Sequence, residues 1–379
     1  MILGWAAAAA YVGLLIAATR RLTDRHPALA DHPPAPTGPL VSVVVPARNE
    51  AANIEPCVRS ILATSYAACE VVVVDDRSTD ETAALIERVA AAEEARGRVR
   101  LVRGSEPPAG WFGKQWALTQ GYRAARGELL LFADADTRHQ PELLPRAVAT
   151  LLAERVDLLT VIPRQELGSF WERLLQPHIL FALGARVGDV RRMNRTRTTW
   201  DAIANGQFIL TTRSAYEGVG THARVKDTVV DDLALAQAYV ADHRDIFLAH
   251  AQAFMSTRMY RSLAEIVAGW TKNLALGAPR MLPPIGVLRA VFPWVSWLPA
   301  LAWLAPPVAW AITGWPFALV ATLASLALWA TVCRTEGVPV GYAFLYPVAA
   351  AVVAFIALRS AWRGRRVEWK GRVYRVESG

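Results

Sequence analysis

Aspartates follow two apolar runs of the chain, and their spacing suits a divalent cation. Asp75 and Asp76 come directly after four valines, and Asp134 and Asp136 come directly after a run of five apolar residues. Residues i and i+2 of an extended segment point to the same side, so Asp134 and Asp136 can reach one Mg²⁺ or Mn²⁺ and a diphosphate that it carries. A single aspartate after a strand is usually turn chemistry, but two clusters in this order favour a site for a nucleotide diphosphate and a metal.

The segments that must position these acids alternate between two periodicities. Short apolar runs predict strands at 41–45, 71–74, 99–102 and 128–133. The stretches between them predict helices at 54–62, from 79 onward and at 116–125. Such alternation implies βαβ units and a mostly parallel sheet, so the expected fold class is α/β. Ligands of open α/β sheets bind beyond the carboxyl ends of the strands, which is where the aspartates lie.

Long apolar segments near both ends predict membrane helices. Hydrophobic residues make up 53% of the 379 residues. The uncharged start of the chain is followed by Arg20 and Arg21, which predicts an uncleaved helix at 1–19 with its basic flank in the cytoplasm. Residues 291–332 carry no charge either, and this length suits two spans of about 20 residues, with a shorter apolar run at 342–358 as a third.

A basic tail follows the C-terminal membrane region, 285–358, and conflicts with this number of spans. The tail at 359–379 contains seven basic residues, and basic residues next to a span mark the cytoplasmic side. Three complete spans after a cytoplasmic domain would place the tail outside. Either one stretch is broken or re-entrant, with Pro306 and Pro307 as the candidate break, or another segment crosses. We expect a cytoplasmic tail, and since it holds much of the net charge of +8, we expect no nucleic-acid partner.

The region between the membrane segments divides by composition. We expect a proline-rich linker at 20–39 and the α/β domain at 40–260. Two amphipathic stretches, at 169–187 and within 261–284, are interrupted by charged residues, and we expect their apolar faces to lie along the membrane surface. None of the three cysteines has CxxC or metal-ligand spacing, so they are expected to be reduced structural thiols.

Three motifs in combination resemble family 2 glycosyltransferases with the GT-A fold. The motifs are Val-Pro-Ala-Arg-Asn-Glu at 45–50, Val-Asp-Asp-Arg-Ser-Thr-Asp at 74–80 and Ala-Asp-Ala-Asp at 133–136, and the resemblance covers residues 40–232. Further motifs are similar to the diaponeurosporenoate glycosyltransferase subgroup of carotenoid biosynthesis, and several are shared with hopene-associated glycosyltransferases. These are Trp-Phe-Gly-Lys-Gln-Trp-Ala at 111–117, Arg-Met-Tyr at 258–260, Gly-Trp-Thr-Lys at 269–272 and Val-Glu-Trp-Lys-Gly-Arg-Val-Tyr at 367–374.

The resemblance implies a role for each matching residue on the donor side. Asp76 would accept a hydrogen bond from the imide N–H of uracil, and Lys114 would approach the diphosphate or the acid that holds it. Asp136 would bind the metal, and Asp134 would lie near the ribose and the metal. The nucleoside pocket would be lined by Pro46, Arg48 and Glu50.

A second pair of acids, Asp231 and Asp232, opens an apolar helix. By family position Asp232 is the general base that inverting transfer to a hydroxyl needs, with Asp231 supporting it or capping the helix. In the carotenoid subgroup the second position of the pair need not be acidic, which leaves Asp231 as an alternative base. An acceptor carboxylate is already ionised near neutral pH and would need little help.

Processive members of the family carry Gln-x-x-Arg-Trp after the base. The corresponding stretch here, 266–270, keeps Trp270 but has neither the glutamine nor the arginine. This favours a single sugar transfer over polymerisation. Lys272 is the residue expected to supply the cation that the missing arginine would give to the leaving diphosphate.

The resemblance therefore implies a membrane-bound, metal-dependent, inverting glycosyltransferase with a GT-A domain between N-terminal and C-terminal transmembrane helices. It would move one hexose from UDP-glucose, or a close relative, to a carotenoid in the bilayer. A hopanoid, another polyprenoid or a sphingolipid is the alternative acceptor, and a processive polysaccharide synthase is less expected. We expect a multi-pass plasma-membrane protein whose catalytic domain is cytoplasmic.

Overall fold

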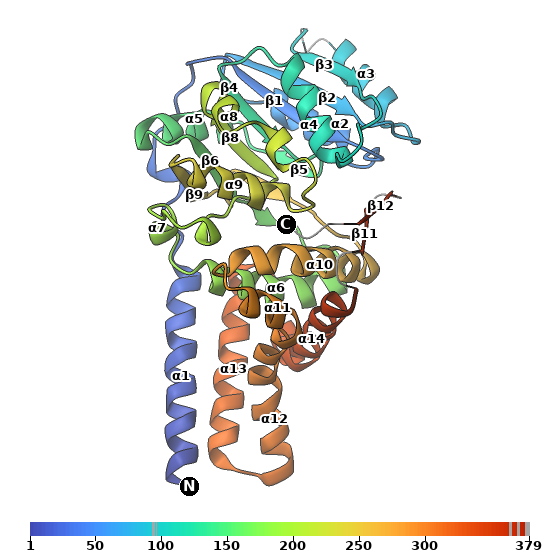
Figure 1. Ribbon diagram of the computed structural model, residues 1–379. Helices are drawn as coiled ribbons and strands as arrows, with labels where there is room; N and C mark the ends of the chain where they lie inside the picture. Colours follow the sequence, from blue (N-terminus) through green and yellow to red (C-terminus); the bar gives the residue numbers. More distant parts are fainter. Residues whose placement is uncertain (93–94, 96, 364–365, 370–371, 376–379) are drawn as a thin grey trace. The chain divides into compact units, whose positions relative to one another are not determined.

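The chain forms two compact units, which we name the helical unit and the sheet unit. The computed structural model describes residues 1–92, 95, 97–363, 366–369 and 372–375 (Figure 1). The helical unit comprises Met1–Arg25, Leu167–Asp189 and Tyr260–Arg365. The sheet unit comprises His26–Glu166, Val190–Met259 and Arg366–Gly379.

A central sheet organises the sheet unit. Its seven strands within the described residues lie in the order β3-β2-β1-β4-β8-β6-β9. β8 is antiparallel to β4 and β6, and the other neighbouring pairs are parallel. The strands are β1 (Val41–Ala47), β2 (Cys69–Asp75), β3 (Val99–Arg103), β4 (Leu129–Ala133), β6 (Leu158–Ile162), β8 (Phe208–Thr212) and β9 (Ile246–His250). The predicted α/β class with a mostly parallel sheet is confirmed, whereas the sequence did not predict the antiparallel β8.

Helices cover both faces of this sheet. On one face Val43 and Val71 pack in a core with Ile54 of α2 and Ile86 of α3. On the other face α4 approaches closely, because a Cβ at Gly121 would lie 2.4 Å from the Val44 side chain. The helices of the unit are α2 (Ile54–Leu62), α3 (Thr82–Ala91), α4 (Gly113–Ala124), α5 (Leu143–Glu154), α7 (Val190–Met193), α8 (Arg213–Gly218) and α9 (Asp231–Ala241).

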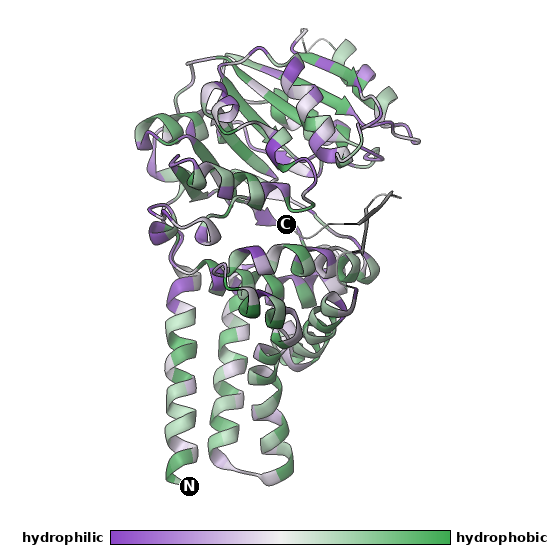
Figure 2. Cartoon of the chain, in the orientation of Figure 1, coloured by the Kyte–Doolittle hydropathy of each residue, from purple (hydrophilic) through white to green (hydrophobic). Residues whose placement is uncertain are grey.

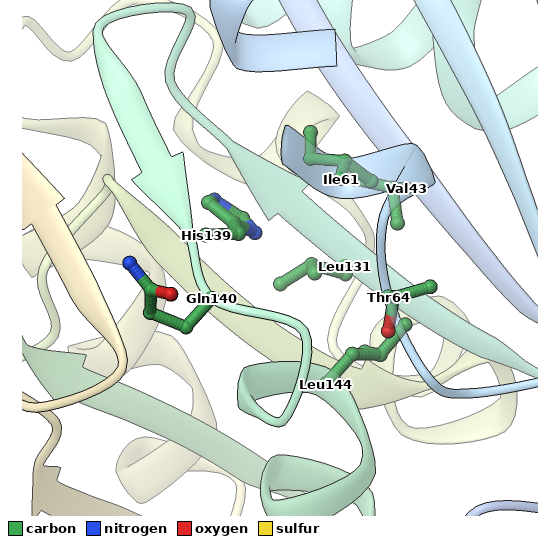
Figure 3. A pocket seen from close by; sticks show the side chains of 7 residues that line it. All are labelled: Val43, Ile61, Thr64, Leu131, His139, Gln140 and Leu144. Carbon is green, nitrogen blue, oxygen red and sulfur yellow. The ribbon is translucent and has the colours of Figure 1, made fainter. Parts of the chain in front are cut away.

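A smaller sheet and a small cavity lie beside the main sheet. The smaller sheet has the order β5-β10-β7, formed by β5 (Thr137–His139), β10 (Met255–Thr257) and β7 (Arg164–Gln165). The cavity has a volume of about 10 Å³, which leaves room for about one water molecule and none for a nucleotide or a lipid. Figure 3 shows the side chains that line it, none of which is a predicted site residue: Val43, Ile61, Thr64, Leu131, His139, Gln140 and Leu144.

The helical unit contains the apolar helices predicted near both ends. By length and composition, three helical stretches of the described chain could cross a membrane: Ile2–Arg21, Pro316–Thr335 and Val340–Arg363. A bent pair, Gly286–Val295 and Leu298–Thr313, would make a fourth, and Figure 2 shows how hydrophobic these segments are. The helices are α1 (Ile2–Thr23), α6 (Phe170–Val187), α10 (Leu263–Gly277), α11 (Gly286–Val295), α12 (Leu301–Thr313), α13 (Pro316–Thr335) and α14 (Tyr346–Arg363).

The break in the C-terminal membrane region differs in position from the prediction. The chain bends by 42° between α11 and α12, whereas Pro306 and Pro307 lie inside α12. Proline has no N–H, so Pro306 cannot donate to the carbonyl of Ala302 four residues earlier. The Tyr11 hydroxyl of α1 donates to that carbonyl instead, at 2.9 Å. The helix is continuous through the two prolines, and the carbonyl opposite Pro306 has a partner in Tyr11.

Apolar side chains of α6 and α10 form a core within the protein, and the expected position of these two helices along the membrane surface stays a prediction. Leu174 and Leu175 of α6 form one core with Ile266 and Trp270 of α10. α6 begins as its sequence indicates, since Ser169 and Glu172 form a capping box. The amphipathic pattern thus identified the helix correctly, but a third helix, α14, covers its apolar side.

The predicted basic tail at 359–379 is described only in part. α14 continues to Arg363. The backbone of β11 (Arg366–Trp369) and β12 (Arg372–Arg375) forms an antiparallel hairpin at the motif 367–374. Residues 364–365, 370–371 and 376–379 lie outside the described part of the chain.

We predict that Leu175→Ala destabilises the protein while Leu183→Ala does not. Leu175 is 0% exposed, whereas Leu183, on the same helix, is 37% exposed. A leucine-to-alanine change in a core costs about 2–5 kcal/mol, and a surface change about 0.5 kcal/mol or less. Thermal unfolding of both purified variants in detergent measures the difference. Equal, small shifts would show that this face of α6 is not core.

Candidate active site

The order of the central strands brings three predicted segments to one edge of the sheet. β2, β1 and β4 are neighbours, and their carboxyl ends are followed by Asp76, by Arg48 and Glu50, and by Asp134 and Asp136. Parallel strands end at the same edge, so residues from 48 to 136 in the sequence meet there.

The Asp76 carboxylate lies between two guanidinium groups. Arg48 Nη1 is 4.0 Å from Asp76 Oδ2, and Arg77 Nε is 3.7 Å from Asp76 Oδ1. Arg48 also donates a hydrogen bond to the Asp76 carbonyl at 2.7 Å. With only 3% of Asp76 exposed, this buried charge is compensated by its neighbours. A carboxylate accepts hydrogen bonds and donates none, so it suits a base that presents N–H groups.

Two motif residues that the sequence analysis left without a role shape these loops. Asn49 has φ 52° and Arg77 has φ 56°, both in the left-handed region. Asn49 Oδ1 accepts from the backbone N–H of Thr79 at 2.9 Å, and the Asn49 N–H donates to Ser78 Oγ at 2.9 Å. These bonds fix the loop after β1 against the loop after β2. Asparagine tolerates the left-handed conformation better than most residues. Its presence directly after a predicted strand was therefore the signal in the sequence that could have indicated a structural role for Asn49.

Lys114 joins the acids of two distant segments. Its Nζ is 2.9 Å from Asp134 Oδ1 and 3.9 Å from Asp231 Oδ2. Burial opposes its charged form, but the nearby carboxylates of Asp134, Asp231 and Asp232 raise the pKa of Lys114 above its ordinary value. Lys114 lies in the first turn of α4, which begins at Gly113, three residues before the predicted start of this helix at 116. Lys114 thus contacts Asp134, one of the two acids proposed for the metal site, and its approach to a diphosphate stays a prediction.

Asp134 and Asp136 fit a cation that is completed by substrate oxygens. Oδ1 of Asp136 is buried and has no hydrogen-bond partner among the described residues. Burial, together with the charges of Asp134 and Glu50, raises the pKa of Asp136 to about 7. The described residues contain no group of three or more His, Cys, Asp or Glu that could hold a metal. Mg²⁺ sites commonly use only one or two carboxylates plus phosphate oxygens and water, so a pair of carboxylates is compatible with such a site.

The two acids that open α9 have different surroundings. Asp231 is the first residue of α9 and makes no capping bond, which corrects the expectation that it caps the helix, because its carboxylate faces Lys114 instead. Burial raises the pKa of Asp231 to about 6, Lys114 opposes this shift, and Asp232 and Asp134 add to it. Asp232 accepts from the backbone N–H of Gly206 at 2.9 Å and of Leu233 at 2.8 Å.

Gly206 is a site residue that the sequence analysis missed. A Cβ at this position would lie 3.2 Å from both Cβ and Oδ2 of Asp232, so the close approach favours glycine. The Asn205-Gly206 dipeptide before an apolar run is a turn signal that could have drawn attention to it. The loops before α4 and α9 are also joined, because the Phe112 N–H donates to the Lys226 carbonyl at 2.8 Å.

The three other predicted residues lie in elements not yet described for the site, one in β1 and two in α10. Pro46 is part of β1, where it pairs with Val74. Trp270 and Lys272 belong to α10 of the helical unit. Trp270 is 7% exposed, and its Nε1 donates to Gln176 Oε1 at 2.7 Å, so its side chain is part of the core of that unit.

Comparisons with known proteins agree with this geometry. Residues 42–220 match glycosyl transferase family 2. The 4,4'-diaponeurosporenoate glycosyltransferase of Staphylococcus haemolyticus is 26% identical over 251 residues, which cover 65% of this chain and 64% of that protein. The protein of the same name from Staphylococcus aureus is 29% identical over 265 residues, covering 67% of this chain and 65% of that protein. The chain thus matches just under two thirds of the length of these relatives.

A solved structure matches more of the chain. The mannosyltransferase from Pyrobaculum calidifontis, in complex with GDP-Man and Mn²⁺, superposes with a TM-score of 0.58 and 26% sequence identity. The match covers 93% of this chain and 97% of that one. The family match, the mostly parallel sheet and the acids at its strand ends agree, and residues 42–220 are a family 2 glycosyltransferase domain with the GT-A fold.

Proposed function

We propose that the protein transfers a single hexose from a nucleotide diphosphate sugar to a lipid in the membrane. The observation that carries this proposal is the cluster of Asp134, Asp136, Lys114, Asp231 and Asp232, which three segments of the sheet unit bring together. The cluster combines a candidate cation site with a candidate base, which are the two functions that sugar transfer from a diphosphate needs.

On the donor side, the proposed nucleotide is UDP and the proposed sugar is glucose. Asp76 would accept from the imide N–H of the base, with Arg48 orienting its carboxylate, and Glu50 and Pro46 would line the nucleoside pocket. The neighbour bound to GDP-Man makes guanine the alternative base. Guanine also presents ring and amino N–H groups, so Asp76 is compatible with it.

Asp134 and Asp136 would hold Mg²⁺ or Mn²⁺ against the donor diphosphate. The neighbour with bound Mn²⁺ supports this assignment, as does the unpartnered Asp136 Oδ1 atom. A bound cation would neutralise the charge that develops on the departing diphosphate. Lys114 would keep Asp134 oriented and add a positive charge beside the diphosphate.

Asp232 is the proposed base. Two backbone N–H groups fix its carboxylate, and each oxygen keeps a lone pair that can take the proton of an acceptor hydroxyl. The hydroxyl oxygen would then attack the anomeric carbon on the face opposite the leaving diphosphate, which inverts that centre. Asp231 would support this geometry through Lys114. An acceptor carboxylate would attack without proton removal.

The proposed acceptor is a carotenoid, in line with the relatives named for diaponeurosporenoate. A hopanoid, another polyprenoid or a sphingolipid remains the alternative class. The glutamine and arginine of processive enzymes are missing before Trp270, which supports one transfer per acceptor, with Lys272 as the proposed substitute cation. The proposed location is the plasma membrane, with the sheet unit in the cytoplasm.

The proposed function is tested with the purified protein in lipid nanodiscs. UDP-glucose and GDP-mannose, each radiolabelled, are supplied with carotenoid acids, hydroxylated carotenoids or a hopanoid. We expect one hexose to reach a carotenoid from UDP-glucose, detected as a single hexose mass increment. Transfer from GDP-mannose alone would overturn the assignment of the donor, and ladders of several hexoses would overturn single transfer.

We predict that Asp136→Asn abolishes metal-dependent binding of the donor. Replacing metal-orienting residues costs about 10–100-fold in affinity, so loss of a direct ligand should cost at least as much. Mn²⁺ binding in the presence of UDP, followed by electron paramagnetic resonance, measures the effect, and EDTA should stop transfer by the unmodified protein. Asp245→Asn removes an equal charge at the ion pair with Arg197 and serves as the control. Transfer at full rate in EDTA would contradict the metal assignment.

We predict different effects for the two adjacent acids. Asp232→Asn should lower the turnover of a hydroxyl acceptor by about 10²–10⁴-fold, the usual cost of losing a general base, while UDP binding measured by calorimetry persists. Asp242→Asn, just after the end of the same helix, is the control. If Asp231→Asn is inactive and Asp232→Asn is active, Asp231 is the base. If both variants stay active, the acceptor is a carboxylate.

A further inference from the structure

α1 and α13 run in the same direction within the helical unit. At one end the rings of Trp5 and Phe317 lie 6.2 Å apart. At the other end Arg25 forms an ion pair with Glu336 at 3.5 Å. Both helices therefore begin at one level and end at one level, and Figure 1 shows them side by side. If Arg20 and Arg21 mark the cytoplasmic end of α1, then α13 also ends on the cytoplasmic side.

The bent pair α11–α12 must therefore cross the membrane completely. α12 ends at a left-handed Gly314, with φ 64°, and the chain reverses there into α13. Because α13 begins at the non-cytoplasmic end, the preceding helices have to bring the chain across. The bond from Tyr11 to the Ala302 carbonyl keeps α12 helical at Pro306. A re-entrant loop would return to the cytoplasmic side and does not fit this order.

α14 packs along its length against α6 and α10. The ring of Tyr342, just before α14, lies 5.5 Å from that of Phe170 at the start of α6. Further along, Ala349 and Ile356 share a core with Leu175 and Ile266. α6 and α10 carry charged residues and are not among the helices that could cross a membrane. Because α14 packs against α6 and α10 over its whole length, it stays at the same membrane depth as these two helices and does not cross.

The opposite side of α14 exposes an apolar stripe. Phe344 is 71% exposed, Phe355 is 54% exposed and Trp362 is 83% exposed. Phe344 lies in the 3₁₀ turn just before α14. Within α14, Phe355 and Trp362 recur with the exposed Val348 and Leu358 at intervals of three, four or seven residues, which places these four side chains on one helical face. Arg359 and Arg363 lie in the last turns. An apolar face next to basic residues is typical of helices that lie in the membrane interface.

We infer that α14 lies along the cytoplasmic leaflet with this stripe against the lipid hydrocarbon, and does not cross. The described chain then crosses three times, through α1, α11–α12 and α13. Arg359 and Arg363 fall on the same side as Arg20 and Arg21, which removes the conflict between the number of apolar segments and the basic end. The inference rests on the proposed membrane location of the helical unit and the cytoplasmic location of the sheet unit.

Reporter fusions to the C-terminus of the full chain test the side of the membrane. We expect green fluorescent protein to fluoresce there and alkaline phosphatase to be inactive, since the phosphatase becomes active only outside the cytoplasm. An active phosphatase fusion with a dark fluorescent fusion would mean that α14 crosses, and would overturn the inference.

Spin labels along the stripe test the orientation of α14. Nitroxides are attached to Val348→Cys, Phe355→Cys and Trp362→Cys in bilayers, and their depth is measured from oxygen and nickel-chelate accessibility. These positions span about 21 Å of helix, at about 1.5 Å per residue. We expect nearly equal depths for α14, whereas Val320→Cys and Ala327→Cys on the crossing α13 should differ by about 10 Å. A steady change of depth along α14 would overturn the inference.

Neither readout depends on sugar transfer. An inactive protein that keeps both results would overturn the proposed function and leave the placement of α14 standing. An active protein in which α14 crosses the membrane would overturn the placement of α14 and leave the proposed function standing.

Discussion

A shortage of positive charge is the constraint around which the site is built. The carboxyl ends of β1, β2 and β4 and the start of α9 bring several carboxylates together, and burying carboxylates costs free energy unless cations or hydrogen bonds compensate them. Lys114 compensates part of this negative charge through its contacts with Asp134 and Asp231. Asp136 keeps a buried oxygen without a partner in the described residues. A further positive charge would compensate this oxygen, which is the role that we propose for a cation that binds together with the substrate.

The contacts that deliver Lys114 to this site are long-range. The backbone bond from Phe112 to Lys226 and the side-chain bond from Gln115 to the Thr228 carbonyl tie α4 to the loop before α9. Because these bonds join segments more than a hundred residues apart, the position of Lys114 depends on the whole sheet being assembled. The site therefore depends on the tertiary fold, since the contacts of Lys114 require both α4 and the loop before α9 to be in position.

The elements with strong local patterns were predictable, and the partners they pack against were not. The buried valines of β2 and the periodicity of α2 are visible in the sequence because each depends on neighbours a few residues away. The antiparallel β8 carries an apolar run like that of a parallel strand, so only its partners β4 and β6 reveal its direction. Leu174 and Leu175 were correctly assigned to a helix, yet an apolar face does not encode whether lipid or protein covers it. Gly206 was missed for the same reason, since its importance lies in the proximity of Asp232.

The hydrogen bond from Tyr11 to the Ala302 carbonyl gives α1 a structural role besides that of a membrane anchor. The same hydroxyl also pairs with Ser325 of α13 at 2.8 Å, so one side chain of α1 joins two helices that are synthesised some three hundred residues later. Without α1, the Ala302 carbonyl of α12 would lose this hydrogen-bond partner beside the two prolines. α1 is therefore a structural partner of α12 and α13 as well as an apolar helix, and an unrelated membrane helix of equal length would lack these two contacts of Tyr11.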